Sequence, residues 1–388
     1  MRKARNAAGA VVLAMAAVAL CFLDLGPAHA PDLGTKERAR VVATDDSAVE
    51  RLGLLQTGPQ KLEVEILSGA HKGERFTAYN QLRAQLELDK VFAPGDVALV
   101  AMVKDAKAGV TPLVAQDHYR IGWTVVLFGL FAVLLAAFGG VTGVMALFSF
   151  VFSCLAVWKL VIPLCLRGWN PMGVSFGAVT VLTAVIMFLV AGFTRKGVAA
   201  FLGAILGVAA SCAMAWIFTG LFRINGAVMP YSQALLYSGY SDLSLSEIFI
   251  GAVFLSSSGA VMDLAMDVAS GMEEIAARRP DLSARELCAS GMRIGRSVVG
   301  TMTTTLLLAY SGGYLTLMMA FLAQGTGPLD FINNPYVASE VVKTLVGSFG
   351  LVLVAPFTAL AGARIFVCGG AGRKCTQATI SLPNSPHK

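Results

Sequence analysis

Charged residues are scarce in this chain. Asp, Glu, Lys and Arg make up 14% of its 388 residues, against roughly a quarter in a typical soluble domain, while 56% of the residues are hydrophobic. The formal net charge of +6 could suggest nucleic acid, but Lys and Arg are scattered at the ends of apolar runs and form no dense basic stripe. The composition therefore indicates a protein of the lipid bilayer and excludes nucleic acid as a partner.

The residue patterns of common enzymes are also missing. The four histidines, His29, His71, His118 and His387, are dispersed, which excludes an HExxH zinc site, and there is no Walker A sequence for ATP. None of the seven cysteines lies between residues 31 and 119, so no disulfide framework is implied there. We expect no enzyme activity, no metal and no cofactor.

The first 30 residues look like a targeting segment. An apolar run from about Ala8 to Leu25 follows "MRKAR" and precedes "AHA", as in a signal peptide. Pro31 directly after Ala30 disfavours cleavage there, so an uncleaved signal anchor that forms the first transmembrane helix is preferred to a cleaved peptide.

Residues 31–120 have a soluble composition. The alternation "KLEVEIL" at 61–67 has the period of two that is typical of a half-buried strand, and Gly and Pro turns separate further strand-like runs. We expect a small extracytoplasmic β-barrel or sandwich of about 90 residues, which acts either as a spacer or as the binding site for a protein partner.

Residues 121–366 are expected to form a transmembrane domain of seven helices. The lengths of the apolar runs fit the requirement of about 20 residues for a helix that crosses the hydrocarbon core. The runs are Ile121 to Phe138, Val141 to Leu164, Val174 to Ala191, Ala199 to Leu221, Ile248 to Ser270, Ile294 to Phe321 and Val341 to Phe366. Gly139-Gly140 is the expected turn between the first two.

With the N-terminal helix, the fold class is an α-helical membrane protein of about eight transmembrane helices, with the all-β domain inserted after the first helix. The positive-inside rule orients it. The sequence "TRK" at 194–196, the arginines between 278 and 296, and Arg364, Arg373 and Lys374 all fall on the cytoplasmic side when both termini are cytoplasmic. Residues 367–388 are then a cytoplasmic tail.

Helix 199–221 carries Gly203, Gly207, Ser211 and Ala215 at successive i+4 positions. Such a stripe of small residues predicts close helix packing in lipid.

Acidic residues stand out in "SSSGAVMDLAMDVASGMEEI" at 256–275. Helical spacing places Asp263, Asp267, Ser270 and Glu274 on one face, opposite Val261, Leu264 and Val268. One hypothesis is that Asp263 faces the bundle interior and binds a cation or carries a proton. The alternative is that the carboxylates hold helices together through ion pairs with Arg293 or Arg296.

The next helix carries Arg296, Gly300, Thr304 and Ser311 near one face, with Tyr310 beside them. Its hydroxyls either face the acidic stripe or bond to carbonyls of their own helix. Gly312-Gly313 allows a helix break that exposes carbonyl oxygens, or a simple kink. The candidate ion- or substrate-binding residues are Asp263, Asp267, Glu274, Arg296, Thr304, Tyr310, Ser311, Gly312 and Gly313.

Three segments together resemble a known family. They are "GAVMDLAMDVAS" at 259–270, "ELCASGMRIGRSVVGTMTTTLLLAYSGGYL" at 286–315 and "GSFGLVLVAPFTAL" at 347–360, and they are similar to the YibE/F-like family of bacterial membrane proteins. With "ILSGAHKGE" and "PGDVALV" in the soluble module, the resemblance extends from roughly residue 60 to 366.

The resemblance implies a polytopic protein of the bacterial plasma membrane with transport as the suggested activity. Asp263 and Asp267 match the family motif, whereas Ser297 and Thr304 stand where the family has Asp and Asn, which weakens the case for Thr304. We therefore expect a secondary transporter or ion-coupled permease for a small ion or solute. The competing hypothesis is a membrane scaffold or assembly factor that acts through its extracytoplasmic β domain.

Overall fold

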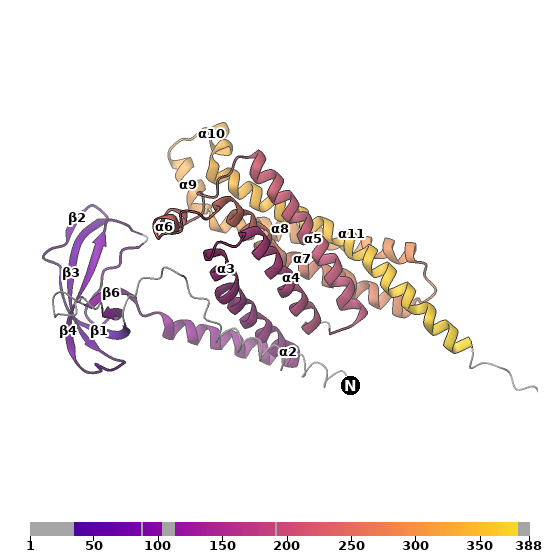
Figure 1. Cartoon of the computed structure of the whole chain (residues 1–388), viewed down its shortest axis with the longest axis horizontal. Helices are drawn as coiled ribbons and strands as arrows, with labels where there is room; N and C mark the ends of the chain where they lie inside the picture. Colours follow the sequence, from indigo (N-terminus) through magenta and orange to yellow (C-terminus); the bar gives the residue numbers. More distant parts are fainter. Residues whose placement is uncertain (1–34, 87, 103–112, 191, 379–388) are drawn as a thin grey trace, which may run out of the picture. The chain divides into compact units, whose positions relative to one another are not determined.

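The computed structural model describes residues 35–378 apart from 87, 103–112 and 191 (Figure 1). The signal segment at 1–30, with its expected first helix, and the end of the tail lie outside the described residues. The chain divides into two compact units, one reaching to Leu135 and one starting at Ala136. Each unit is described by itself.

The first unit contains a small β-barrel, as the alternation at 61–67 indicated. Its strands are β1 (Thr35–Asp45), β2 (Glu50–Leu52), β3 (Leu55–Ile66), β4 (Arg75–Arg83), β5 (Val97–Met102) and β6 (Leu113–His118). The sheet order β1-β5-β6-β4-β3-β2 closes through an additional β1–β3 pairing, and β4–β6 is a parallel pair. This connectivity is that of a five-stranded OB-type barrel, with β2 as an added hairpin strand.

Alternation along the strands decides which side chains fill the barrel. In β3, Leu62, Val64 and Ile66 are buried, while Lys61 and Glu63 point outward. In β1, Ala39 and Val41 point inward, so the residues between and beside them face outward.

The second unit is a helical bundle. Its first helix, α2, begins in the first unit and crosses the boundary at Ala136. The helices are α2 (Ile121–Ala156), the π-helical turn η1 (Val157–Val161), α3 (Ile162–Leu166), α4 (Pro171–Val190), α5 (Arg195–Leu221), α6 (Ser232–Tyr237), α7 (Leu245–Arg278), α8 (Ala284–Gly313), α9 (Leu315–Ala323), α10 (Pro328–Asn333) and α11 (Pro335–Ala378).

Among the described residues, five helices are long and apolar enough to cross a membrane, or six if the bent pair of α8 and α9 is one span. The expected total of eight crossings is therefore not confirmed. Ile121–Leu166 is counted as one stretch, although its helix is interrupted at Gly140, where φ is 54° and ψ is −132°. The interruption falls at the predicted Gly139-Gly140 position, because glycine adopts positive φ without a Cβ clash.

The small-residue stripe on α5 packs as predicted. Gly203, Gly207 and Ser211 are buried against α11, and a Cβ on Gly203 would lie 2.8 Å from the Thr358 Cα atom. A Cβ on Gly207 would lie 3.0 Å from the Val354 Cβ and 3.1 Å from a methyl carbon of Val261 on α7. The core of the bundle is therefore built from α5, α7 and α11, whose backbones approach closely because α5 has almost no side chain at the contact.

We predict that Gly203→Val destabilises the bundle by about 1–3 kcal/mol, because the new side chain meets the α11 backbone, which cannot move aside. Thermal unfolding of the purified protein in detergent measures the effect. Gly220→Val on the same helix is the matched control, because a Cβ there has nothing within 4 Å. Equal melting temperatures for the two variants would contradict close α5–α11 packing.

Candidate functional site

The candidate site is built on α7. Ser244 caps its N-terminus by accepting a hydrogen bond from the Glu247 backbone N–H at 3.4 Å, and the helix continues to Arg278. Val261, Leu264 and Val268 are fully buried, which agrees with the predicted apolar face. Asp263 and Asp267, on the opposite face, are exposed. The expectation that Asp263 faces the packed interior of the bundle is therefore wrong, because the close-packing face of α7 is the apolar one.

The second helix of the site is α8, which runs antiparallel to α7. Its N-terminus has the capping box of Ser283 and Glu286. Gly271 lies against Ile294, and a Cβ on Gly295 would be 3.7 Å from a Val268 methyl carbon. At the far end, the Ser256 and Tyr310 hydroxyls are hydrogen-bonded at 2.9 Å.

This register places Asp263 level with Thr301 and Asp267 level with Ser297. Both α8 residues are exposed, as the two aspartates are. The opposite side of the α7–α8 contact is covered by α11, where Ala355 lies beside Gly295. The exposed carboxylates of α7 and the exposed hydroxyls of α8 thus lie at the same levels of one helix pair, and we call this set of residues the polar face (Asp263, Asp267, Ser297, Thr301 and Thr304).

The hydroxyls of α8 bond to their own helix. Thr304 donates to the Gly300 carbonyl at 3.2 Å, Thr301 to the Val298 carbonyl at 2.9 Å and Ser311 to the Leu307 carbonyl at 2.7 Å. This is the back-bonding alternative that the sequence left open. It engages the hydroxyl protons and leaves oxygen lone pairs on the surface, which a cation can use as neutral ligands.

The predicted ion pairs between α7 and α8 do not form among the described residues. Glu274 pairs with Arg278 of its own helix at 2.7 Å, and Arg293 donates to Ser290 at 3.1 Å. Asp263, Asp267 and Arg296 have no ion-pair partner within the described chain, and Arg296 is exposed on α8. Helix pairing through these carboxylates is therefore not what holds α7 to α8.

The sequence allowed either a helix break or a simple kink at Gly312-Gly313, and the structure has a break directly after these two residues. The α8 helix ends at Gly313, α9 begins at Leu315, and the two axes differ by 62°. Gly312 and Gly313 are exposed, whereas Tyr310, just before them in α8, is partly buried and is hydrogen-bonded to Ser256 of α7. The break lies near the end of the helix pair, far along α8 from Arg296.

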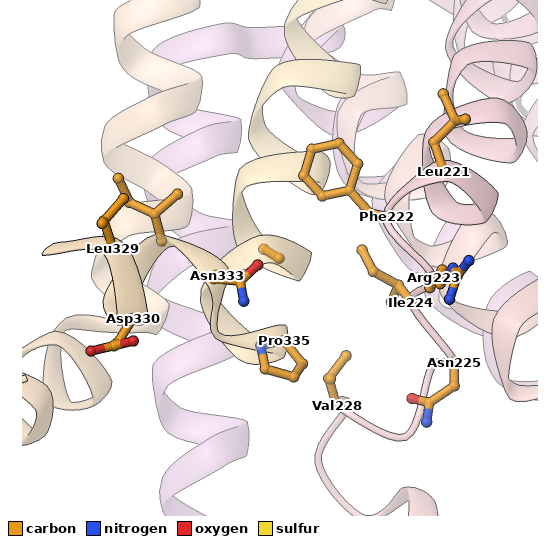
Figure 2. Close-up of a pocket in the computed structure, with 12 residues that line it drawn as sticks. Leu221, Phe222, Arg223, Ile224, Asn225, Val228, Leu329, Asp330, Asn333 and Pro335 are labelled. Atoms are coloured by element: carbon orange, nitrogen blue, oxygen red, sulfur yellow. The ribbon is translucent and has the colours of Figure 1, made fainter. Parts of the chain in front are cut away.

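A pocket of about 830 Å³ lies at the end of the bundle where α5 ends and α11 begins. Figure 2 shows Phe222, Ile224 and Val228 on one side of it, and Leu329 and Pro335 on the other. Its polar lining residues are Arg223, Asn225, Asp330 and Asn333.

Sequence reasoning missed this pocket, because its two walls are about 100 residues apart in the chain. The backbone of Arg223 marks the pocket in the structure, because its φ of 53° is unusual for a residue with a side chain. Pro335 of α11 lines the pocket, whereas Val354 of the same helix lies at the level of Val261 on α7. Between Pro335 and Val354 the helix rises about 30 Å. The pocket and the polar face are therefore separate places on the bundle.

Long apolar helices with few charges, together with a small β-barrel, define a helical membrane protein. The particular family follows from the chain itself: a family model described as YibE/F-like protein matches residues 127–367, so the chain belongs to the YibE/F-like family. The match covers the helical region that includes the polar face, and the β-barrel lies outside it. No curated protein and no solved structure matches the chain.

We predict that the polar face is open to water. In a cysteine-free background, Asp263→Cys should react about tenfold faster or more with a hydrophilic thiosulfonate reagent than Leu264→Cys, because the reactive thiolate forms only where water reaches it. Leu264 is the matched control, since it is the adjacent residue and is fully buried. Equal labelling rates for the two cysteines would show that water does not distinguish the two faces of α7.

Proposed function

We propose that the protein is an ion-coupled permease of the bacterial plasma membrane, in which Asp263 binds the coupling cation or proton. One observation carries the proposal: Asp263 is a carboxylate without an ion-pair partner among the described residues, on a helix that is otherwise apolar enough to cross a membrane. The protein is proposed to move its solute without chemical change, so no enzyme activity is assigned.

Asp263 has few possible surroundings at membrane depth. An unpaired carboxylate inside a bilayer costs several kcal/mol if it faces lipid, so it faces water, a bound cation or another protein group. The α8 hydroxyl oxygens at the same level of the helix pair are suitable neutral ligands for a cation, and Asp267 adds a second carboxylate one helical turn away. The polar face is thus proposed as the lining of a water-filled route that reaches Asp263.

The break between α8 and α9 supports a moving element at one end of this route. Broken helices in transporters supply backbone carbonyls and allow one half of the helix to move. Here the bend of 62° follows Gly312-Gly313 directly. Tyr310 and Ser256 hold α7 to α8 just before the bend. We propose that this hydrogen bond marks the end of the rigid part of the site.

The proposed topology keeps eight crossings. If the interruption at Gly140 is a turn, residues 121–139 and 141–166 are each long enough to span the bilayer. With α4, α5, α7, the α8–α9 pair and α11, these make seven, and the apolar run near the N-terminus would be the eighth.

The central test is flux in proteoliposomes under imposed ion and pH gradients, with the wild-type chain and Asp263→Asn compared at equal amounts of folded protein. We predict that wild-type flux falls to the level of empty vesicles in the variant, because the amide keeps the shape and removes the charge that binds the cation. Asp242→Asn, the same change in an exposed loop, is the control and should leave flux unchanged. Wild-type flux that survives Asp263→Asn would disprove the assigned coupling site.

A second candidate function is favoured by a different observation. Leu52, Leu54, Leu55 and Leu86 are exposed at one end of the barrel, where the Ala84 backbone N–H donates to the Gln56 carbonyl. Exposed apolar clusters of this kind mark protein-binding surfaces. This end of β3 is opposite the end near α2, so the leucines point away from the membrane that α2 enters. A scaffold or assembly factor that binds a protein through the barrel is therefore the alternative to transport. Absence of flux in every gradient, with a partner captured only when these leucines are intact, would favour it.

The orientation is tested by cysteine labelling in intact cells. We predict that a membrane-impermeant maleimide labels Glu63→Cys in the barrel and leaves Arg285→Cys in the first turn of α8 unlabelled until the cells are opened. The reason is the cytoplasmic excess of Lys and Arg in the loops at 194–196 and 278–296. The reversed labelling pattern would overturn the proposed topology.

A further inference from the structure

A second pocket lies where the barrel meets the start of α2. It has a volume of about 480 Å³. All of its lining residues belong to the first compact unit. They come from β1, the loop after β3, β5 and the first turns of α2, and are Arg38, Arg40, Leu67, Val97, Tyr119, Gly122, Trp123 and Val126.

Two arginines give this pocket its positive charge. Arg38 and Arg40 face outward because Ala39 and Val41 between and beyond them fill the barrel. The Arg38 guanidinium lies over the Tyr119 ring, 5.4 Å from its centre. Neither arginine has a carboxylate within ion-pair distance among the described residues.

No carboxylate is among the residues that line the pocket. Glu37, next to Arg38 in β1, is buried and lies beside Gly69 in the loop after β3. Glu65, which is opposite Arg40 in the β1–β3 ladder, lies 3.9 Å from Arg75. Asp117 pairs with Arg120 at 2.8 Å. Asp96 accepts a hydrogen bond from the Ala93 backbone N–H at 2.8 Å. The pocket is therefore lined by two guanidinium groups and by no carboxylate.

The pocket also lies at the level where α2 would enter the bilayer. The apolar stretch begins at Ile121, and Trp123 and Val126 are 79% and 60% exposed. Tyr and Trp concentrate at the membrane–water interface, so Tyr119 and Trp123 mark the depth of the lipid headgroups. At that depth the arginines meet phosphate, and Trp123 and Val126 meet the upper part of the acyl chains.

We propose that this pocket binds one anionic phospholipid, whose phosphate is held by Arg38 and Arg40 and whose glycerol and upper acyl chain lie along Trp123 and Val126. Guanidinium groups suit phosphate because their N–H donors match its oxygens in pairs. A zwitterionic lipid gains less, since no carboxylate lines the pocket to meet its ammonium group. The site is independent of the proposed transport activity and of Asp263.

The test uses the full-length chain reconstituted in nanodiscs of equal parts phosphatidylglycerol and phosphatidylcholine, then released into mild detergent for native mass spectrometry. The wild-type protein is expected to retain phosphatidylglycerol in preference to phosphatidylcholine. Arg38→Gln with Arg40→Gln is expected to weaken that retention roughly ten- to thirty-fold, because two charges near the headgroup are lost. Arg51→Gln with Arg83→Gln, two exposed arginines at the other end of the barrel, is the matched control and should have no effect.

A second variant tests the pocket without changing charge. A Cβ on Gly122 meets only the Tyr119 ring, at 4.0 Å, so Gly122→Leu fits the backbone and fills the pocket. It is expected to lower phosphatidylglycerol retention as the arginine variant does. Unchanged retention in both variants overturns the proposal, and so does equal retention of the two lipids by the wild type. The third measurement repeats the retention experiment in the presence of inorganic phosphate. If millimolar phosphate displaces the lipid completely, the site recognises a free anion and the lipid assignment is wrong.

Discussion

The cost of placing a carboxylate against hydrocarbon constrains what can lie next to Asp263 and Asp267 on α7. A soluble protein could leave Asp263 and Asp267 exposed at little cost, because water solvates them. On a helix that crosses a membrane the same exposure costs several kcal/mol, so the face that carries them needs water, a cation or a protein group next to it. The described residues provide hydroxyl oxygens on α8 and no ion-pair partner. This is why the polar face is the candidate site of a chain that belongs to the YibE/F-like family.

The close packing of α5, α7 and α11 decides where that face points. Gly207 leaves room for Val261 and Val354 to meet at the core, and Val268 fits against Gly295 of α8. These contacts leave α7 little freedom to rotate about its axis, because a rotation would move a carboxylate into the glycine contacts. The apolar side of α7 is therefore locked inward and its acidic side is directed to the open side of the α7–α8 pair. The outward position of the carboxylates is thus a consequence of core packing.

In the barrel and at the start of α2, the positions of the charged residues have a different cause. Strand alternation in β1 places small apolar residues inside and Arg38 and Arg40 outside, and the apolar run of α2 begins directly after β6. The two patterns together bring positive charge to the level of the bilayer surface, where aromatic residues lie as well. The membrane therefore has two different effects on this chain: it excludes the charges of α7 from lipid and attracts those of β1 to the headgroups.

The sequence by itself determined the membrane class, the β-rich module, the helix interruption at Gly140, and the shared face of Asp263 and Asp267, because each of these depends on local composition or periodicity. At Gly312-Gly313 it allowed a break or a kink, and the structure decided for the break. The sequence could not determine which way the face of Asp263 and Asp267 points, because periodicity relates residues of one helix to each other and says nothing about neighbouring helices. Nor could it decide between an ion site and the alternative of ion pairs with Arg293 or Arg296, because equal depth does not bring two side chains together; among the described residues these pairs are absent. Only the tertiary structure decided the α7–α8 register, the carboxylates' place opposite the packed core, and the pockets at Arg223 and at Arg38, whose walls come from segments far apart in the chain.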